Sequence, residues 1–344
     1  MERLKMRTFD GVAAISFMIL TPLFLTLPSA LIDESGNNAW LTLLISALIL
    51  LPLFMIMLSQ MKRYQNLSII EIVTLALGKP VGYIYKVIIA LYFSAFAGRI
   101  ISETAELLNN FGFDNTPLYI TCIFFVLTAV LMALLGKRGL FKTVSFFFMS
   151  LIIGFICAVL VGLNRYDPTY LAPVSIDAPL INSALQNTWL FGGLLLLFLY
   201  MPNLSPKRAN KSGLIALALS AGIGTLFMTC YIMMFSAPVA RSLNFGYMEM
   251  GKTGYYNHFF YRFESVFMIF AIIAVVISAS ISIFSAAGTN GSRPFIIICG
   301  LFTLMAALAP LNWQMIFIYA TPCVFAVPLI AFIMGLISNK RVIE

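Results

Sequence analysis

The chain has 344 residues, of which 61% are hydrophobic and 10% are charged, and its mean hydropathy is +0.98. A soluble domain of this size could not bury that much apolar surface, so the composition excludes one and predicts an integral membrane protein. The net charge of +8 does not indicate nucleic-acid binding, because the basic residues follow the membrane topology described below.

Long apolar runs predict ten membrane-spanning helices, since a helix needs about 20 apolar residues to cross a bilayer. The last run is long enough for two helices and contains a turn at Ala309-Pro310-Leu311-Asn312. Between the second and third spans, residues 67–77 are too few to cross and predict a helix on the cytoplasmic face. The expected spans are 9–32, 38–59, 80–110, 117–135, 140–163, 180–201, 212–238, 262–287, 294–309 and 314–337.

The basic residues predict the orientation of these spans. If the N-terminus is cytoplasmic, sixteen of the 21 Lys and Arg residues lie in inner segments and Arg99 lies within a span. The four outer ones are Arg165, Arg241, Lys252 and Arg262. Cytoplasmic loops are rich in Lys and Arg, so both termini are expected inside.

The first span is interrupted near its middle at Thr21–Pro22. Proline removes a backbone donor, and the carbonyl groups that it frees cannot stay unpaired in hydrocarbon. Interrupted helices of this kind line ligand cavities in transporters, although proline and glycine are also common in ordinary membrane helices.

The third span holds a cluster of ionisable residues, Arg99, Glu103 and Glu106. Arg99 and Glu103 are four residues apart and share a helix face, so they can pair. Charges at this depth should face protein or water. The cluster is interpreted either as a gate, proton relay or anchor for a ligand ammonium group, or as a paired structural cluster near the outer interface.

The sixth span is interrupted at Gly192–Gly193, in the same relative position as the first. An odd number of spans in each half forces the halves into opposite orientations. We therefore expect one transmembrane domain over residues 1–344, built as a 5+5 inverted repeat of about 9–163 and 180–337. Paired interruptions in two halves are typical of a small-molecule site between them.

The eighth span opens with Arg262 and Glu264 and later carries Ser278 and Ser282. The charged pair either meets the third-span cluster or is ordinary interfacial charge. The two hydroxyl groups share a face and either coordinate Na⁺ with carbonyl groups of the first span or let helices approach closely. Before this span, the Tyr- and Phe-rich residues 240–261 predict an outer loop at the level of the lipid headgroups.

Five short motifs in order resemble the B-subunit family of bacterial spore germinant receptors, also called spore germination permeases. The motifs are Leu27-Pro28-Ser29, Leu77-Gly78-Lys79 with Gly82, Glu103-Thr104-Ala105-Glu106 with Thr116-Pro117, Gly136-Lys137-Arg138-Gly139, and Arg262-Phe263-Glu264-Ser265. The resemblance implies a leucine-transporter-like fold of the amino acid–polyamine–organocation superfamily. It also implies A and C receptor subunits as partners, the spore inner membrane as location, and sensing of small nutrients. The chain departs from the family at Gly193, where an acidic residue often follows the break, which leaves the ligand class open.

We interpret the chain as a ten-helix membrane protein that binds a nutrient such as an amino acid at mid-membrane and signals germination. The alternatives are an ion-coupled amino-acid permease and a structural subunit that docks partners without binding ligand. No catalytic constellation is found, so we expect no enzyme, no cofactor and no metal centre. The expected ligand-binding residues are Thr21, Pro22, Tyr92, Trp189, Phe191, Gly192 and Gly193. The expected gate or relay residues are Arg99, Glu103, Glu106 and Glu264, and the possible cation ligands are Ser278 and Ser282.

Overall fold

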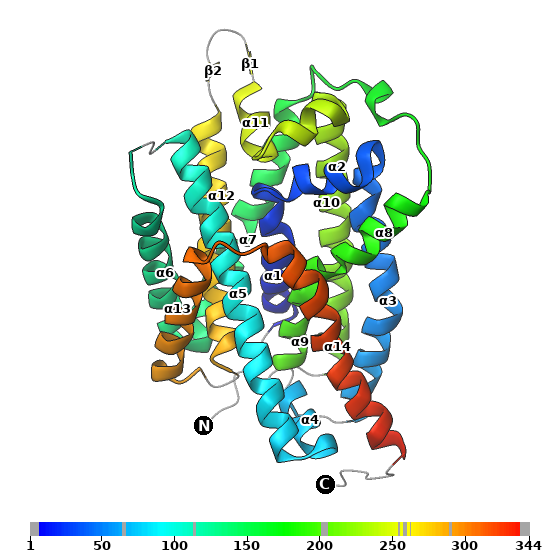
Figure 1. Cartoon of the computed structure of the whole chain (residues 1–344), viewed down its shortest axis with the longest axis vertical. Coiled ribbons are helices and arrows are strands. Elements are labelled where there is room, and N and C mark those ends of the chain that lie inside the picture. The colour runs from blue at the N-terminus through cyan, green and yellow to red at the C-terminus, as the bar shows by residue number, and fades with distance from the viewer. Residues whose placement is uncertain are drawn as a thin grey trace.

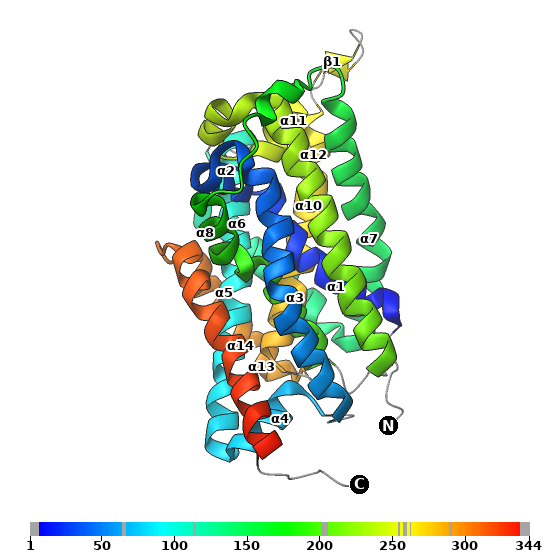
Figure 2. The ribbon, with the colours of Figure 1, turned by 90° about the vertical axis from the view of Figure 1, so that its right-hand side faces the viewer.

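The computed structural model describes residues 7–63, 67–112, 115–200, 206–253, 255–256, 260–261, 263–288 and 291–337. Most of its helices run along the long axis of the molecule and pack side by side (Figures 1 and 2). Helix α1 (Thr8–Leu20) begins and α14 (Trp313–Ile337) ends at the same end of this bundle (Figure 1). We call this the inner end, following the predicted topology, and the opposite end the outer end.

Seven segments of the described chain have the length and hydropathy of complete membrane spans, and three shorter apolar helices accompany them. The three short ones are Thr8–Phe24, Leu118–Leu134 and Arg293–Leu308. Together they follow the predicted spans in order, although the short helices fall below the length of a full crossing. The long helices between the two ends are α3 (Ala39–Arg63), α5 (Lys79–Phe111), α7 (Gly136–Val161), α10 (Pro206–Ser242, kinked at Ser236) and α12 (Glu264–Ala286), and the shorter α6 (Leu118–Leu134) and α13 (Arg293–Leu308) lie beside them.

The first span is broken where the sequence predicts it. Helix α1 ends at Leu20, a 3₁₀ turn η1 (Thr21–Phe24) follows, and the helix resumes as α2 (Leu27–Ser35). Leu25, between them, has φ −110° and ψ −137°, far from helical values. As a result α2 runs across the bundle instead of along it, and a short 3₁₀ turn η2 (Gly36–Asn38) leads on to α3 (Figure 1).

The sixth span is broken too, over a longer stretch than the glycine pair indicated. It consists of α8 (Ala178–Gln186), a 3₁₀ segment η4 (Asn187–Leu194) and the short α9 (Leu195–Leu199). Runs of 3₁₀ helix beyond three or four residues are uncommon and often mark a functional hinge. An outer 3₁₀ turn η3 (Pro168–Leu171) precedes it and packs on α10.

Two further predictions concern the segments outside the spans. The helix predicted over residues 67–77 is confirmed as α4 (Ile69–Leu77), capped by Ser68 and Glu71, while its position on the cytoplasmic face stays a prediction. The outer loop is only partly as predicted, because it contains helix α11 (Gly246–Thr253) and the strands β1 (Tyr255–Tyr256) and β2 (Phe260–Tyr261).

The prediction of headgroup-level rings is wrong for Tyr247, which is fully buried. Its ring packs 4.5 Å from Phe24 and 4.6 Å from Phe267, measured between centroids, so α11 inserts an aromatic side chain above the first break.

The core lies along the contacts of α5 with α12 and α13 and of α1 with α10. Gly98 lets α5 and α13 touch, since a Cβ there would lie 2.6 Å from Ala306 Cβ. Such small-residue contacts are how membrane helices pack closely. The helical membrane fold with broken first and sixth helices is therefore confirmed apart from the short strands β1 and β2, while the limits of the two repeats stay a prediction.

Candidate ligand site and outer cavity

The break in the sixth span packs directly against the first span, on α1 just before its own break. A Cβ on Gly193 in η4 would lie 2.9 Å from Met18 Cβ and 3.3 Å from the carbonyl oxygen of Ile15, both on α1. Only glycine allows this approach, because any side chain would have to displace α1. The glycine pair therefore brings together the first and sixth spans, which lie far apart in the sequence.

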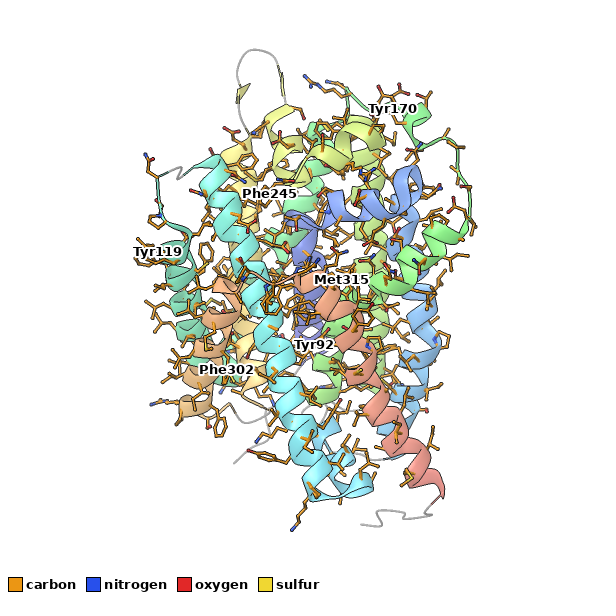
Figure 3. The ribbon with its side chains drawn as sticks, viewed as in Figure 1. Tyr92, Tyr119, Tyr170, Phe245, Phe302 and Met315 are labelled. Atoms are coloured by element: carbon orange, nitrogen blue, oxygen red, sulfur yellow. The ribbon has the colours of Figure 1, made fainter. Side chains whose placement is uncertain are left out.

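Tyr92 of α5 covers the neighbouring glycine. A Cβ on Gly192 would overlap the Tyr92 hydroxyl group, which lies 3.1 Å from the hydroxyl group of Thr321 on α14. The Tyr92 ring lies edge-on to Phe317 at a centroid distance of 5.4 Å. Figure 3 shows Tyr92 near the middle of the molecule, between α5 and α14.

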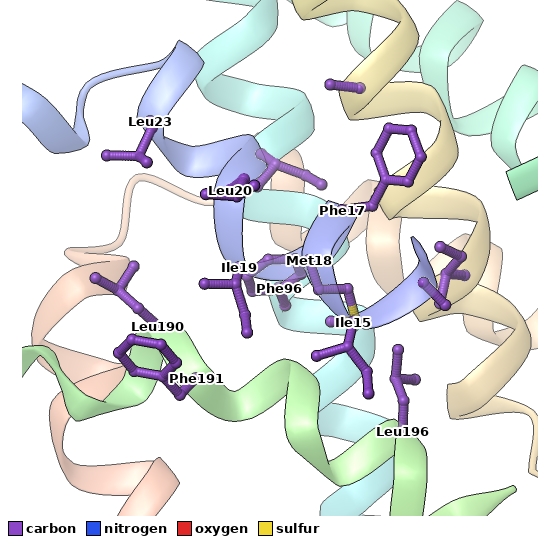
Figure 4. Packing of buried hydrophobic residues seen from close by; sticks show 14 of the residues in the cluster. Ile15, Phe17, Met18, Ile19, Leu20, Leu23, Phe96, Leu190, Phe191 and Leu196 are labelled. Atoms are coloured by element: carbon purple, nitrogen blue, oxygen red, sulfur yellow. The ribbon is translucent and has the colours of Figure 1, made fainter. Parts of the chain in front are cut away.

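The space between the breaks is occupied by apolar side chains. Figure 4 shows Met18 and Ile19 of α1, Phe96 of α5 and Phe191 of η4 gathered there. All four are at most 3% exposed. A ligand that binds between the breaks must therefore displace side chains, Phe191 and Ile19 among them.

Thr21 and Ser278 form a buried hydroxyl pair that joins the first break to α12. Their oxygen atoms lie 2.6 Å apart, and both hydroxyl groups approach the carbonyl oxygen of Phe17, at 2.6 and 3.1 Å. The Ala274 carbonyl oxygen is 3.4 Å from Thr21 Oγ1. Ser282 lies one turn further on, and its hydroxyl group donates to the carbonyl oxygen of Ser278 in its own helix. Pro22, the other expected residue of this break, is buried in η1.

Arg99 and Glu103 form a nearly buried ion pair, with Arg99 Nε 2.6 Å from Glu103 Oε1. The guanidinium group lies 4.5 Å from the centroid of the Trp189 ring, which stacks on Phe317. The other carboxylate oxygen of Glu103 accepts a long bond of 3.5 Å from the backbone N–H of Thr26, at the start of α2. The pair thus touches both broken spans.

A cavity of about 500 Å³ opens beside this pair, toward the outer end. We call it the outer cavity; α5, α6, the turn between α13 and α14, and Thr26 enclose it. It is lined by Thr26, Arg99, Ser102, Glu103, Ala105, Glu106, Leu118, Cys122, residues 307–312, Trp313 and Gln314. The structure therefore brings Arg99, Glu103 and Glu106 together, as the spacing predicts.

Glu264 is not among the residues that line this cavity; it begins α12 and lies beside Gly251 of α11. Arg262, its expected neighbour, lies outside the described residues.

Sequence reasoning missed Glu34 of α2. Its carboxylate accepts hydrogen bonds of 2.7 Å from Ser183, 2.6 Å from Asn187 and 2.6 Å from Gln314. It thereby connects both broken spans to α14. In the sequence, the one indication was the polar pair of Ser183 and Asn187, which are four residues apart in the predicted sixth span.

A family model described as spore germination protein matches residues 5–309 of the chain. The chain belongs to this family. Spore germination protein KB of Bacillus subtilis (strain 168) is 25% identical over 258 residues, which cover 73% of this chain and 69% of that protein. Spore germination protein A2 of the same organism is 25% identical over 279 residues, covering 78% and 75%. These matches confirm the resemblance to the B-subunit family of germinant receptors.

Solved transporter structures share the fold of this spore germination protein. A Na⁺-coupled sialic acid symporter in an outward-open state superposes with a TM-score of 0.64 at 12% identity, covering 99% of this chain and 80% of its own. MhsT in complex with L-phenylalanine also gives 0.64, at 16% identity, covering 98% and 89%. The manganese transporter of Eremococcus coleocola gives 0.57 with an aromatic compound bound, at 14% identity, covering 96% and 70%. At these identities the likeness establishes the leucine-transporter-like fold alone.

Proposed function

We propose that this chain is the nutrient-sensing membrane subunit of a spore germinant receptor, and that it binds a small molecule such as an amino acid between its two breaks. The observation that carries the proposal is the direct packing of η4 on α1 at Gly193 and Met18. Where two interrupted helices meet in an apolar core, backbone groups at the interruptions can pair with a bound ligand. Thr21, Pro22, Tyr92, Trp189, Phe191, Gly192 and Gly193 are the proposed binding residues.

The lining of this site favours a small ligand with an uncharged side chain. By the family resemblance an acidic residue often follows the break where this chain has Gly193, and the neighbouring side chains at positions 18, 19 and 191 are apolar. The N-terminus of a half-helix favours a carboxylate. At α2 the Glu103 carboxylate already lies there, so a ligand carboxylate would compete with it for Thr26.

We place the chain in the spore inner membrane with both termini cytoplasmic, acting with A and C subunits. The basic residues of the inner segments support this orientation. The named relatives are germination proteins, which supports a role in receptor assembly over one in bulk uptake.

An ion-coupled amino-acid permease is the second candidate, and the hydroxyl pair of Thr21 and Ser278 favours it. The hydroxyl oxygen of Ser278 and the carbonyl oxygens of Phe17 and Ala274 all lie within 3.4 Å of Thr21 Oγ1. Hard cations such as Na⁺ are bound by oxygen ligands of these kinds. The fold is also that of a Na⁺-coupled symporter.

Ligand binding and flux separate these functions. The purified full-length chain in lipid nanodiscs should bind a labelled nutrient from a germinant screen, while vesicles containing the chain alone should not accumulate it. Concentrative uptake that depends on a Na⁺ gradient would favour the permease. Absence of binding to any nutrient that germinates a strain carrying this receptor alone would reject the binding role.

A further inference from the structure

The charges of the outer cavity are incompletely paired. Arg99 is 4% exposed and uses Nε on Glu103, but its Nη1 has no hydrogen-bond partner among the described residues. A buried donor without a partner is costly, and such groups usually meet a ligand, an ion or water. Arg99 also lines the cavity, so a turn of its guanidinium group would bring the buried Nη1 to an acceptor on a molecule bound there.

Glu106 supplies the opposite charge. It lies one turn beyond Glu103 on the same face of α5, is exposed, and also lines the cavity. Within the described chain its carboxylate has no hydrogen bond or ion pair. The cavity therefore offers an unpaired cationic donor and an unpaired carboxylate.

We propose that the outer cavity is a second binding site, distinct from the space between the breaks, and that it takes a small zwitterion. The ammonium group of the ligand would lie on Glu106 and its carboxylate would accept from Arg99 Nη1. A simple amine would leave Nη1 unpaired, and a simple carboxylate would be repelled by Glu106. Only a molecule with both charges satisfies both groups.

The other residues that line the outer cavity are uncharged and can contact the side chain of an amino acid. Leu118, Ala307 and Trp313 are apolar, whereas Ser102 and Asn312 are neutral and polar. A volume of about 500 Å³ holds a free amino acid of moderate size and lies within the range of ligand pockets.

A ligand bound in this site would affect both breaks, because two of the charged residues that line the site already contact them. Arg99 lies over Trp189 in η4, and Glu103 reaches the N–H of Thr26 before α2. A carboxylate on Nη1 would draw the guanidinium group toward the cavity. The outer site is thus placed to modulate the central one.

The test uses three probes that share one apolar tail: L-leucine, isoamylamine without the carboxylate, and 4-methylpentanoate without the ammonium. Leu311 lines the cavity and is 51% exposed. In a full-length chain whose five cysteines are replaced by alanine, Leu311→Cys gives a reporter thiol at the cavity. Its rate of modification by a neutral maleimide is measured in nanodiscs.

L-leucine at ten times its Kd should slow the modification by about tenfold, by mass action, and neither analogue should do so at the same concentration. Glu106→Gln should abolish the protection. Glu249→Gln, which removes an outer carboxylate elsewhere, should retain it, and so should Gly192→Ala, which alters the space between the breaks. Equal protection by isoamylamine, protection that survives Glu106→Gln, or no protection at about 10 mM L-leucine would each overturn the proposal.

Discussion

The Tyr92 hydroxyl group fills the volume that a side chain at position 192 would need. This contact makes Gly192 a sensitive position, because a methyl group there must push Tyr92 away from Thr321 or move η4. Inserting a methyl group into a packed core usually costs about 1–3 kcal/mol.

Gly192→Ala should therefore weaken nutrient binding by about 5- to 150-fold, if that cost falls on the ligand-binding conformation. Binding to the purified chain and abundance in the membrane are both measured. Gly222→Ala is the matched control, because Gly222 also lies in a membrane helix but has open space around it. Equal affinity of the two variants would remove Gly192 from the site.

We predict that the ion pair of Arg99 and Glu103 both stabilises the fold and takes part in the nutrient response. Glu103→Gln leaves a buried guanidinium group without its counter-charge, which costs about 3–5 kcal/mol for a buried pair. We expect this variant to lose abundance. The double variant Arg99→Met/Glu103→Gln should regain abundance, since no charge is stranded, and still fail to respond to nutrient. A response restored together with abundance would show that the pair only stabilises the fold.

Residue types alone predicted part of this site. Arg99, Glu103 and Glu106 were found because charges in apolar helices are costly and therefore conspicuous. Glu34 was missed because it lies near the predicted end of a span, where charge is ordinary. The outer cavity was missed because it depends on how the turn of residues 309–312 folds back over α5.

At the scale of the helices, the breaks divide the first and sixth spans into short pieces held by side-chain contacts. Thr21 and Ser278 provide one such contact between the first break and α12. Hydrogen bonds between membrane helices contribute about 0.6 kcal/mol on average and at most about 1.7.

A double-mutant cycle with Thr21→Val and Ser278→Ala should show a coupling of this size in the free energy of unfolding. Denaturant unfolding in detergent is the measurement. The pair Thr128→Val with Ser278→Ala is the control, because Thr128 donates to Phe124 in its own helix and is exposed. A coupling indistinguishable from the control would mean that the hydroxyl groups do not hold the break to α12.

Element positions were the best-predicted feature of the chain. A helix that crosses the hydrocarbon core must be long and apolar, so the apolar runs predicted the ends of α5 and α14 to within one residue. Pro22 predicted the position of the first break. The length of η4 was not predictable from two glycines. Nor was the burial of Tyr247, because aromatic composition does not say whether a ring faces lipid or protein.

At the scale of the whole molecule, this spore germination protein has a leucine-transporter-like fold, and its two proposed binding sites lie between the breaks and in the outer cavity. The connections between its helices are short. A signal from the breaks must therefore pass through helix faces or through inner elements such as α4, which packs on both α5 and α14. This arrangement favours a sensor that acts on partner subunits.

The A and C subunits should accordingly co-purify with this chain from detergent extracts of spores, and deleting either should abolish the nutrient response. The physical reason is that ligand binding shifts an equilibrium only if the two states differ in some contact, and a partner against the inner surface supplies that difference. Vesicles with the chain alone should take up no more labelled nutrient than protein-free vesicles. Concentrative uptake by the isolated chain, with a response that survives deletion of the partners, would instead establish a free-standing permease.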